Sequence, residues 1–437
     1  MTDKLHSGNV DWYLSRFSEY ERSLNGKSNG ALHHLKREAI EKFSGQGFPT
    51  TKDEEWKYTN LSQMLADNFN PFVTPDISTI KLPRLFSGQE LTTIVLVNGK
   101  LIREKSDINH LPDFMQVEAL SSLPENDVVR LISSSPSEDV FTNLNTAFFQ
   151  DGVYIRIMNN YIEKKPLHIL NVTRTNGNQP LCQPRTILHI ETGANARILE
   201  TFIGTDGESY FTNPVSTYQL ADNASVEHYR VQLDGDHAYH ISNTEVHLER
   251  AANFVSHSIS IGSLLNRNDY NVVLSGEDAN CTLNGLYIGD KEQLIDNRTL
   301  IAHTRPHCTS TQVYKGILDQ KARGVFNGKI HVYPDAQKTN AIQSNNCLLL
   351  SDDAVMNAKP QLEIYADDVR CTHGATVGQL DSEAYFYLQS RGIDRKTAQG
   401  MLIHAFASDV LTSMSLESVK NWVTALFVKK LHTIKVE

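Results

Sequence analysis

The residues Val325-Phe-Asn-Gly-Lys-Ile-His-Val332 alternate between apolar and polar side chains along much of their length. In a β-strand, Phe326, Ile330 and Val332 would lie on one face and the polar residues between them on the other, because successive side chains point to opposite faces. Short β-branched runs recur from about residue 92 to residue 380, and no convincing long helix interrupts them. The pattern therefore predicts a mainly β core.

A loose repeat of strand, small turn and strand overlies this region. Starting at Ala194, the turn alanines Ala224, Ala252 and Ala279 follow at steps of 30, 28 and 27 residues. A period near this length in an all-β stretch indicates a solenoid, in which successive coils stack strand on strand. Turns also recur in a β-sandwich, so the repeat alone leaves both folds open.

Helical patterns flank the β region at both ends. Residues 11–24 and 31–43 place apolar side chains at helical spacing, and the Pro-rich, polar stretch 70–83 predicts a linker. Beyond residue 380, we predict a helix over 382–390, a second helix capped by Asp394, and a last helix with an apolar stripe. We therefore predict three regions: an N-terminal helical domain with its linker (1–90), a β core (91–380) and a C-terminal helical domain (381–437).

Composition and charge exclude several classes of protein. The chain has 437 residues, 40% hydrophobic and 21% charged, with a net charge of −10. These are ordinary values for a globular protein, and the acidic balance argues against a nucleic-acid binder. No stretch approaches the roughly 20 apolar residues of a membrane span, and the N-terminus has no apolar run typical of a secretory signal. We expect a cytoplasmic protein that binds neither membrane nor nucleic acid.

Cysteine usage also indicates a reducing compartment. The cysteines are odd in number and scattered, and no Cys-x-x-Cys occurs, so neither a disulfide framework nor a zinc ribbon is expected. The five positions are Cys182, Cys281, Cys308, Cys347 and Cys371.

The sharpest candidate for chemistry is Cys371-Thr-His373. If residues 369–377 form a strand, Cys371 and His373 lie on the same face, roughly 6.5–7 Å apart along the chain. Thiolate and imidazole both suit iron or an iron–sulfur cluster. Two ligands are too few for a complete site, and a cysteine among small apolar neighbours is more typical of a core.

Three other patterns are weaker. The segment His303-Thr-Arg-Pro-His-Cys308 is better read as a loop, because Pro306 argues against the helix that a metal-binding His pair needs. The pairs Asp352-Asp353 and Asp367-Asp368 could serve a β-helix enzyme that cleaves a polysaccharide, but Asp is also a common turn residue. No phosphate-binding glycine loop occurs, so ATP hydrolysis by this chain is not expected.

The run Ala366-Asp-Asp-Val-Arg-Cys-Thr-His-Gly-Ala-Thr-Val-Gly378, followed by Tyr387-Leu-Gln-Ser-Arg-Gly-Ile393, resembles the SufD branch of the SufB/SufD family of the SUF system for iron–sulfur cluster assembly. The Cys-Thr-His-Gly-Ala-Thr pattern favours SufD over its paralogue SufB. Other segments that carry the resemblance are Glu55–Thr59, Ser310, Tyr314–Leu318, Val325–Gly328, Asp335–Thr339, Gln343 with Asn345, Leu348–Ser351 and Pro360–Ile364.

The resemblance implies both a fold and a function. It implies a right-handed parallel β-helix, which decides for a solenoid over a sandwich. It further implies a non-catalytic scaffold in a complex with SufB and two copies of the ATPase SufC, with iron or a cluster held transiently in the complex and no cofactor bound tightly to the isolated chain. A homodimer of the isolated chain is left open.

The resemblance also implies site residues. It assigns a metal or cluster role near the interface with SufB to His373, with Cys371 beside it. It assigns SufC docking to the C-terminal helices, at Tyr387, Leu388, Arg391, Gly392, Ile393, Leu402 and Phe406.

Overall fold

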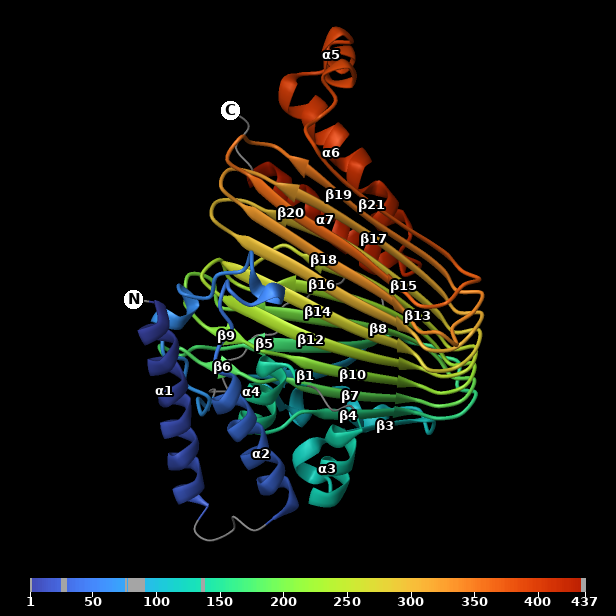
Figure 1. Ribbon diagram of the computed structural model, residues 1–437. Coiled ribbons are helices and arrows are strands. Elements are labelled where there is room, and N and C mark those ends of the chain that lie inside the picture. The colour runs from blue at the N-terminus through green and yellow to red at the C-terminus, as the bar shows by residue number, and fades with distance from the viewer. Residues whose placement is uncertain (1, 25–29, 75–76, 78–90, 135–137, 434–437) are drawn as a thin grey trace.

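The computed structural model describes residues 2–24, 30–74, 77, 91–134 and 138–433, and within them it forms a β-solenoid with helices at both ends (Figure 1). One sheet, here called the first sheet, runs in the order β2-β1-β5-β8-β11-β13-β15-β17-β19-β21. The second sheet runs β20-β18-β16-β14-β12-β10-β7-β4-β3, with β6 and β9 beside it. Much of the predicted linker, at 75, 76 and 78–83, lies outside the described residues.

The strands of the first sheet are β1 (Thr92–Val97), β2 (Lys100–Leu101), β5 (Leu167–Thr173), β8 (Asn195–Gly204), β11 (Ser225–Leu233), β13 (Asn253–Ser260), β15 (Asn280–Gly289), β17 (Thr309–Leu318), β19 (Asn340–Leu349) and β21 (Arg370–Gly378). Those of the second sheet are β3 (Met115–Ala119), β4 (Val153–Ile157), β6 (Leu181–Cys182), β7 (Arg185–Ile190), β9 (Phe211–Thr212), β10 (Val215–Leu220), β12 (Tyr239–Leu248), β14 (Leu265–Leu274), β16 (Leu294–His303), β18 (Arg323–Val332) and β20 (Val355–Ile364). The helices are α1 (Thr2–Ser23), α2 (Ala31–Gln46), α3 (Glu125–Ser133), α4 (Val140–Phe148), α5 (Ser382–Ser390), α6 (Arg395–Thr412) and α7 (Glu417–Thr433).

Parallel pairing confirms the solenoid. From β5 to β21, successive strands of the first sheet pair in parallel, and Ser225 of β11 stands in register with Asn253 of β13, which stands in register with Asn280 of β15. A sandwich built from hairpins would pair its neighbours antiparallel. In the described residues antiparallel pairing is confined to β1 with β2 and β3 with β4.

The repeated alanines mark the tight turn that begins each coil. Ala194, Ala224, Ala252 and Ala279 are buried to within 1% of their surface and belong to the apolar core between the two sheets. The residue before each of them has a left-handed φ of 55–68°. Because the turn is tight, it leaves room for only a small side chain on the inside. The same small residue therefore recurs in each coil, which makes the repeat visible in the sequence.

Helices cover the outer faces of both sheets. Residues of α1, α2 and α4 form one cluster with Phe211, Tyr239 and Leu265 of the second sheet. Residues of α6 and α7 form another cluster with Tyr229, Leu286 and other side chains of the first sheet. The amphipathic pattern of the sequence therefore reflects packing on the solenoid rather than separate helical bundles.

Two short helices inside the β region were not predicted. Helix α3 carries Val128, Leu131 and Ile132 on a face buried against the second sheet, and every residue of α4 is buried. A nine-residue helix that is buried all round has no periodic contrast for the sequence to display.

Among the described helices, none is long and apolar enough to cross a membrane.

His168 gives the fold a testable dependence on pH. The side chain is 4% exposed on β5, with Nε2 3.0 Å from Thr201 Oγ1, and burial lowers its pKa to about 3. Between the unfolded-state pKa near 6.5 and this value, the unfolded chain binds a proton that the folded chain does not, so stability falls as pH falls. Between pH 6 and pH 4, we expect His168→Asn to reduce the slope of the unfolding free energy against pH by about 1.4 kcal/mol per pH unit, as measured in urea titrations. The exposed His34 on α2 supplies the control His34→Asn, and equal slopes for wild type and His168→Asn would refute the assignment.

Candidate functional site at the last coil

The solenoid ends in two strands that have no further partner among the described residues. β21 is the outermost strand of the first sheet and β20 is the outermost strand of the second. Both edges therefore present backbone N–H and C=O groups on one side. Apolar side chains are exposed beside them, including Ile364 at 40%, Tyr365 at 61% and Val377 at 47%. Such an edge is suited to contact with another protein.

Cys371 and His373 lie on β21 and alternate as predicted. Cys371 stands in register with Ala341, and His373 with Gln343, on the adjacent β19. Ala341 and Gln343 are buried, so the face shared by Cys371 and His373 continues the interior of the solenoid. Because no coil follows β21 in the described chain, His373 is exposed and Cys371 is half-buried. The two side chains stand at the open mouth of the interior.

The environment of Cys371 keeps its thiol protonated. Cys371 packs against an apolar cluster that contains Val332, Ala336 and Ala341. Burial raises its pKa above the usual range, which outweighs the opposing hydrogen bond at Ala341. A thiol in such surroundings becomes a thiolate when a metal ion or another positive charge arrives, because ligation releases the proton.

Of the described residues, Cys371 and His373 are the two ligand-type side chains that we place at the mouth. No group of three or more His, Cys, Asp or Glu residues that could hold a metal ion occurs in the part of the chain that the structure describes. Below His373, the neighbouring Gln343 amide donates to Gln312, whose side-chain oxygen accepts from Thr299. These are hydrogen-bonding groups rather than preferred ligands of iron, so a metal or cluster here would need ligands from another molecule.

The burial and the raised thiol pKa of the remaining cysteines indicate a structural role. Cys182, Cys281, Cys308 and Cys347 are buried and free of disulfides. Burial raises the pKa of each thiol, to about 11 for Cys308 and about 12 for Cys182 and Cys347. The segment from His303 to Cys308 forms a strand end and a turn, in which His303 is bound to Ser310.

The paired aspartates occupy turns. Asp352 and Asp353 precede β20, Asp367 and Asp368 precede β21, and all four are exposed. Lys338 is ion-paired with Asp368. Exposed, turn-forming carboxylates of this kind do not favour the alternative of a polysaccharide-cleaving enzyme.

Polar contacts fasten the α6–α7 loop to the first sheet. Ser415 donates its backbone N–H to Glu227 over 3.0 Å, and Leu416 donates its own to the Tyr229 hydroxyl over 2.9 Å. Burial alone would raise the pKa of Glu227, but hydrogen bonds from His257, Ser415 and Tyr229 lower it to about 2. The carboxylate is therefore charged throughout the physiological range.

Ion pairs attach the same helices to other coils. Lys315 of β17 meets Asp409 of α6 at 2.5 Å, and Lys430 of α7 meets Asp290, beyond the end of β15, at 2.6 Å. Lys315 also donates to the carbonyl of Phe406 and lies over its ring. Phe406, one of the predicted docking residues, therefore faces the solenoid.

The helical hairpin α5–α6 extends away from the solenoid beyond this attachment (Figure 1). No residue of α5 is buried; Phe386 is 72% and Tyr387 56% exposed, and Arg391 lies over the Tyr387 ring. Asp394 caps α6 by accepting from Thr397 N, as predicted, and Gly392 turns the chain with a φ of 85°. Leu388, Ile393 and Leu402 are half-buried, whereas Arg391 and Gly392 are exposed.

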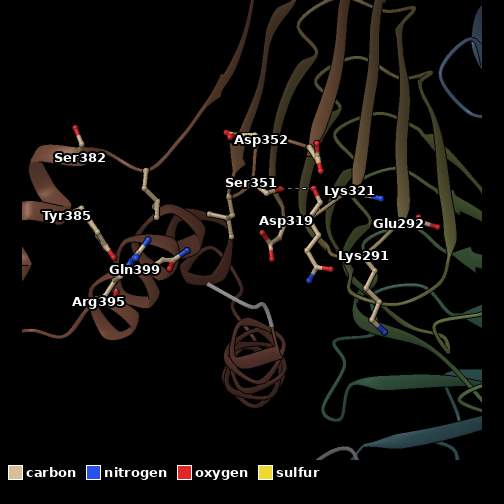
Figure 2. A pocket seen from close by; sticks show the side chains of 14 residues that line it. Lys291, Glu292, Asp319, Lys321, Ser351, Asp352, Ser382, Tyr385, Arg395 and Gln399 are labelled. Atoms are coloured by element: carbon tan, nitrogen blue, oxygen red, sulfur yellow. Dashed lines mark hydrogen bonds between the residues drawn. The ribbon is translucent and has the colours of Figure 1, made fainter. Parts of the chain in front are cut away.

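A polar cavity of about 1030 Å³ separates the hairpin from the solenoid turns. Figure 2 shows Tyr385, Arg395 and Gln399 of the hairpin on one side of it and Lys321 and Asp352 of the turns on the other. Since the cavity keeps α5 and the start of α6 clear of the sheet, these elements offer a surface on several sides.

Sequence reasoning missed a buried charge cluster that holds the N-terminal region, although its Glu55-Trp56 residues were noted as a motif. Arg267 of β14 lies 2.7 Å from Asp296 and 3.1 Å from Asp269, and its guanidinium stacks 3.7 Å from the centre of the Trp56 ring. Glu55 accepts from Arg267 through its carbonyl and from Arg298 through its carboxylate. We call Trp56, Arg267, Asp269 and Asp296 the N-terminal latch.

Comparisons with known proteins find similarity over most of the chain. A family model described as "SUF system FeS cluster assembly, SufBD core domain" matches residues 173–406, and one for the "SufBD protein N-terminal region" matches residues 8–169. An iron–sulfur cluster assembly SufBD family protein of Synechocystis is 31% identical over 437 residues, covering 96% of this chain and 95% of that protein. The iron–sulfur cluster assembly protein SufD of Escherichia coli is 32% identical over 387 residues, covering 88% and 90%. SufD of Bacillus subtilis is 25% identical over 440 residues, covering 96% and 98%.

Proposed function

Because the chain belongs to the SufBD family of the SUF system for iron–sulfur cluster assembly, and its relatives include SufD proteins, we propose that it is a non-catalytic scaffold subunit that pairs with SufB and docks the ATPase SufC. ATP hydrolysis would then belong to SufC. The proposal rests on the presence, in one chain, of a solenoid with open strand edges and a projecting helical hairpin.

Pairing with SufB would use the last coil. The free edges of β20 and β21 can each accept a strand, and the exposed apolar residues beside them would be covered in such a contact. Cys371 and His373 would then lie at the junction, where SufB could contribute the missing ligands. Iron and sulfide are the cargo of this site, which would hold them transiently in the complex.

SufC docking would use the exposed α5–α6 hairpin. Phe386 and Tyr387 expose most of their aromatic surface, and exposed aromatic residues are typical of an interface centre. The polar contacts of Ser415, Lys315 and Lys430 would transmit a displacement of the hairpin to the solenoid. Movement driven by SufC would in this way open and close the junction with SufB.

The docking prediction is tested by point substitution rather than by truncation. Removing α5–α7 would expose the apolar outer face of the first sheet and confuse misfolding with lost binding. We expect the double substitution Phe386→Ala and Tyr387→Ala to weaken binding of purified SufC roughly thirtyfold or more in calorimetry, as for central aromatic residues of an interface.

The matched control is Phe114→Ala. Phe114 is also an exposed aromatic residue, at 54%, and it stacks on Tyr161 near β3, a segment far along the chain from the hairpin. Its substitution should leave SufC affinity unchanged. If the double variant is folded and binds SufC as tightly as wild type, docking through α5 is wrong.

A further inference from the structure

A cavity of about 730 Å³ lies among the N-terminal helices, far from the last coil along the chain. Its walls come from α1, α2, α3 and the end of α4, together with the segment around Phe72. Tyr20 and Phe72 stack with ring centres 5.5 Å apart, and Leu32, Val128 and Phe148 add apolar surface. A volume and lining of this kind are typical of sites for small organic molecules.

Lys36 is the charged residue buried in this wall. Its side chain is 6% exposed, and its ammonium donates to the Phe149 carbonyl over 2.5 Å. The ammonium also lies 4.5 Å from the centre of the Phe149 ring and 5.3 Å from that of Tyr20. The Phe149 carbonyl accepts one of the three N–H groups of the ammonium, and the two ring faces give weaker contacts that supply no counter-charge.

No carboxylate of the described residues lies within ion-pair distance of Lys36. The neighbouring lysine of the same helix, Lys42, is exposed and pairs with Glu138. A buried ammonium without a counter-ion is costly, and an anion that enters the cavity would relieve that cost. The arrangement is therefore incomplete without a negatively charged group.

We propose that this cavity binds a small apolar monocarboxylic acid, whose carboxylate pairs with Lys36 and whose hydrocarbon body packs against Tyr20, Phe72 and Phe148. Glu19 and Glu125 also line the cavity and are exposed. Their charges disfavour a ligand with two or more negative charges, such as a phosphate ester. The proposal does not depend on the role of the chain in cluster assembly.

The affinity should depend on pH with a definite sign. Burial lowers the pKa of Lys36 to about 8, and a bound carboxylate stabilises the charged form. Affinity for a carboxylate should therefore fall as pH rises above 8. The other titratable groups that face the cavity are Glu19 and Tyr20 from α1 and Glu125 from α3.

The test is calorimetric titration of the full chain with hexanoate, 1-hexanol and hexyl phosphate. We expect hexanoate to bind at least tenfold more tightly than hexanol, which lacks the charge, and more tightly than hexyl phosphate. Lys36→Met should weaken hexanoate binding roughly tenfold or more, whereas Lys42→Met should leave it unchanged.

The comparison of hexanoate with hexanol uses wild-type protein alone, so the proposal stays testable if Lys36→Met fails to fold. Equal affinities for the two compounds would overturn the proposal. So would a folded Lys36→Met variant that binds hexanoate like wild type, tighter binding of hexyl phosphate, or the absence of saturable binding at tens of millimolar hexanoate.

Discussion

His373→Ala is expected to reduce cluster formation by the assembled complex tenfold or more. His373 is exposed at the mouth of the interior with Cys371 beside it, so an imidazole there is free to ligate. Loss of groups that merely orient a metal ligand already costs roughly 10–100-fold in affinity, so loss of a ligand should cost at least as much. The measurement is the rate of appearance of cluster absorbance in anaerobic reconstitution, with ATP hydrolysis by SufC followed in parallel.

The control is Thr372→Ala on the same strand. Thr372 lies between the two candidates, is exposed, and points to the opposite face of β21. It should form cluster at the wild-type rate, and both variants should keep SufC activity. An unaltered cluster yield in His373→Ala would leave this histidine as a surface residue and remove the metal assignment.

Arg267→Met is expected to destabilise the fold by about 3–5 kcal/mol, the usual cost of removing one partner from a buried ion pair. The substitution leaves Asp296 buried without its cation, leaves Asp269 only the more distant Arg298 at 3.9 Å, and removes the group that stacks on Trp56. Burial already raises the pKa of Asp296, against the opposing effect of Arg267. Urea unfolding should show the loss, and limited proteolysis should show earlier cleavage near residues 54–66.

Two companion variants separate charge from packing. Arg298→Met removes a partly exposed ion pair with Glu55 and a longer contact of 3.9 Å with Asp269, and should cost about 1 kcal/mol, well below the loss for Arg267→Met. Adding Asp269→Asn and Asp296→Asn to Arg267→Met should recover part of the stability, because fewer charges remain buried. A loss below about 1 kcal/mol for Arg267→Met would show that the N-terminal latch contributes little, since buried pairs normally cost more to break.

The sequence predicted the fold where local chemistry repeats. The buried alanines at 194, 224, 252 and 279 recur because each coil needs a small residue after a left-handed turn. Period alone did not exclude a sandwich; the family resemblance decided that question, and the parallel register confirms it. The helices α3 and α4 escaped prediction because burial on all sides removes the apolar–polar contrast of α4, and α3 is only nine residues long.

The candidate site was predictable in part. Strand alternation placed Cys371 and His373 on one face, and β21 has that geometry. The sequence could not show that β21 is the last described strand of its sheet. The exposure of Cys371 and His373 follows from that position, because no further coil covers them. Contacts that join residues far apart in sequence, such as Trp56 with Arg267 and Glu227 with Ser415, follow from the completed fold and leave no local signal.

The spacing of the contacts that hold α6 and α7 has a mechanical consequence. They attach to β11 through Glu227, to β17 through Lys315 and to the turn after β15 through Asp290. A pull on α5 would load these anchors together, in shear, whereas a single anchor would let the helices peel off strand by strand. Gly392, whose φ of 85° lies in the left-handed region that glycine adopts readily, forms the bend between α5 and α6. A displacement of α5 would reach the three anchors through this one bend, so part of any movement at the tip would be taken up as a change of angle between α5 and α6 rather than passed to the solenoid.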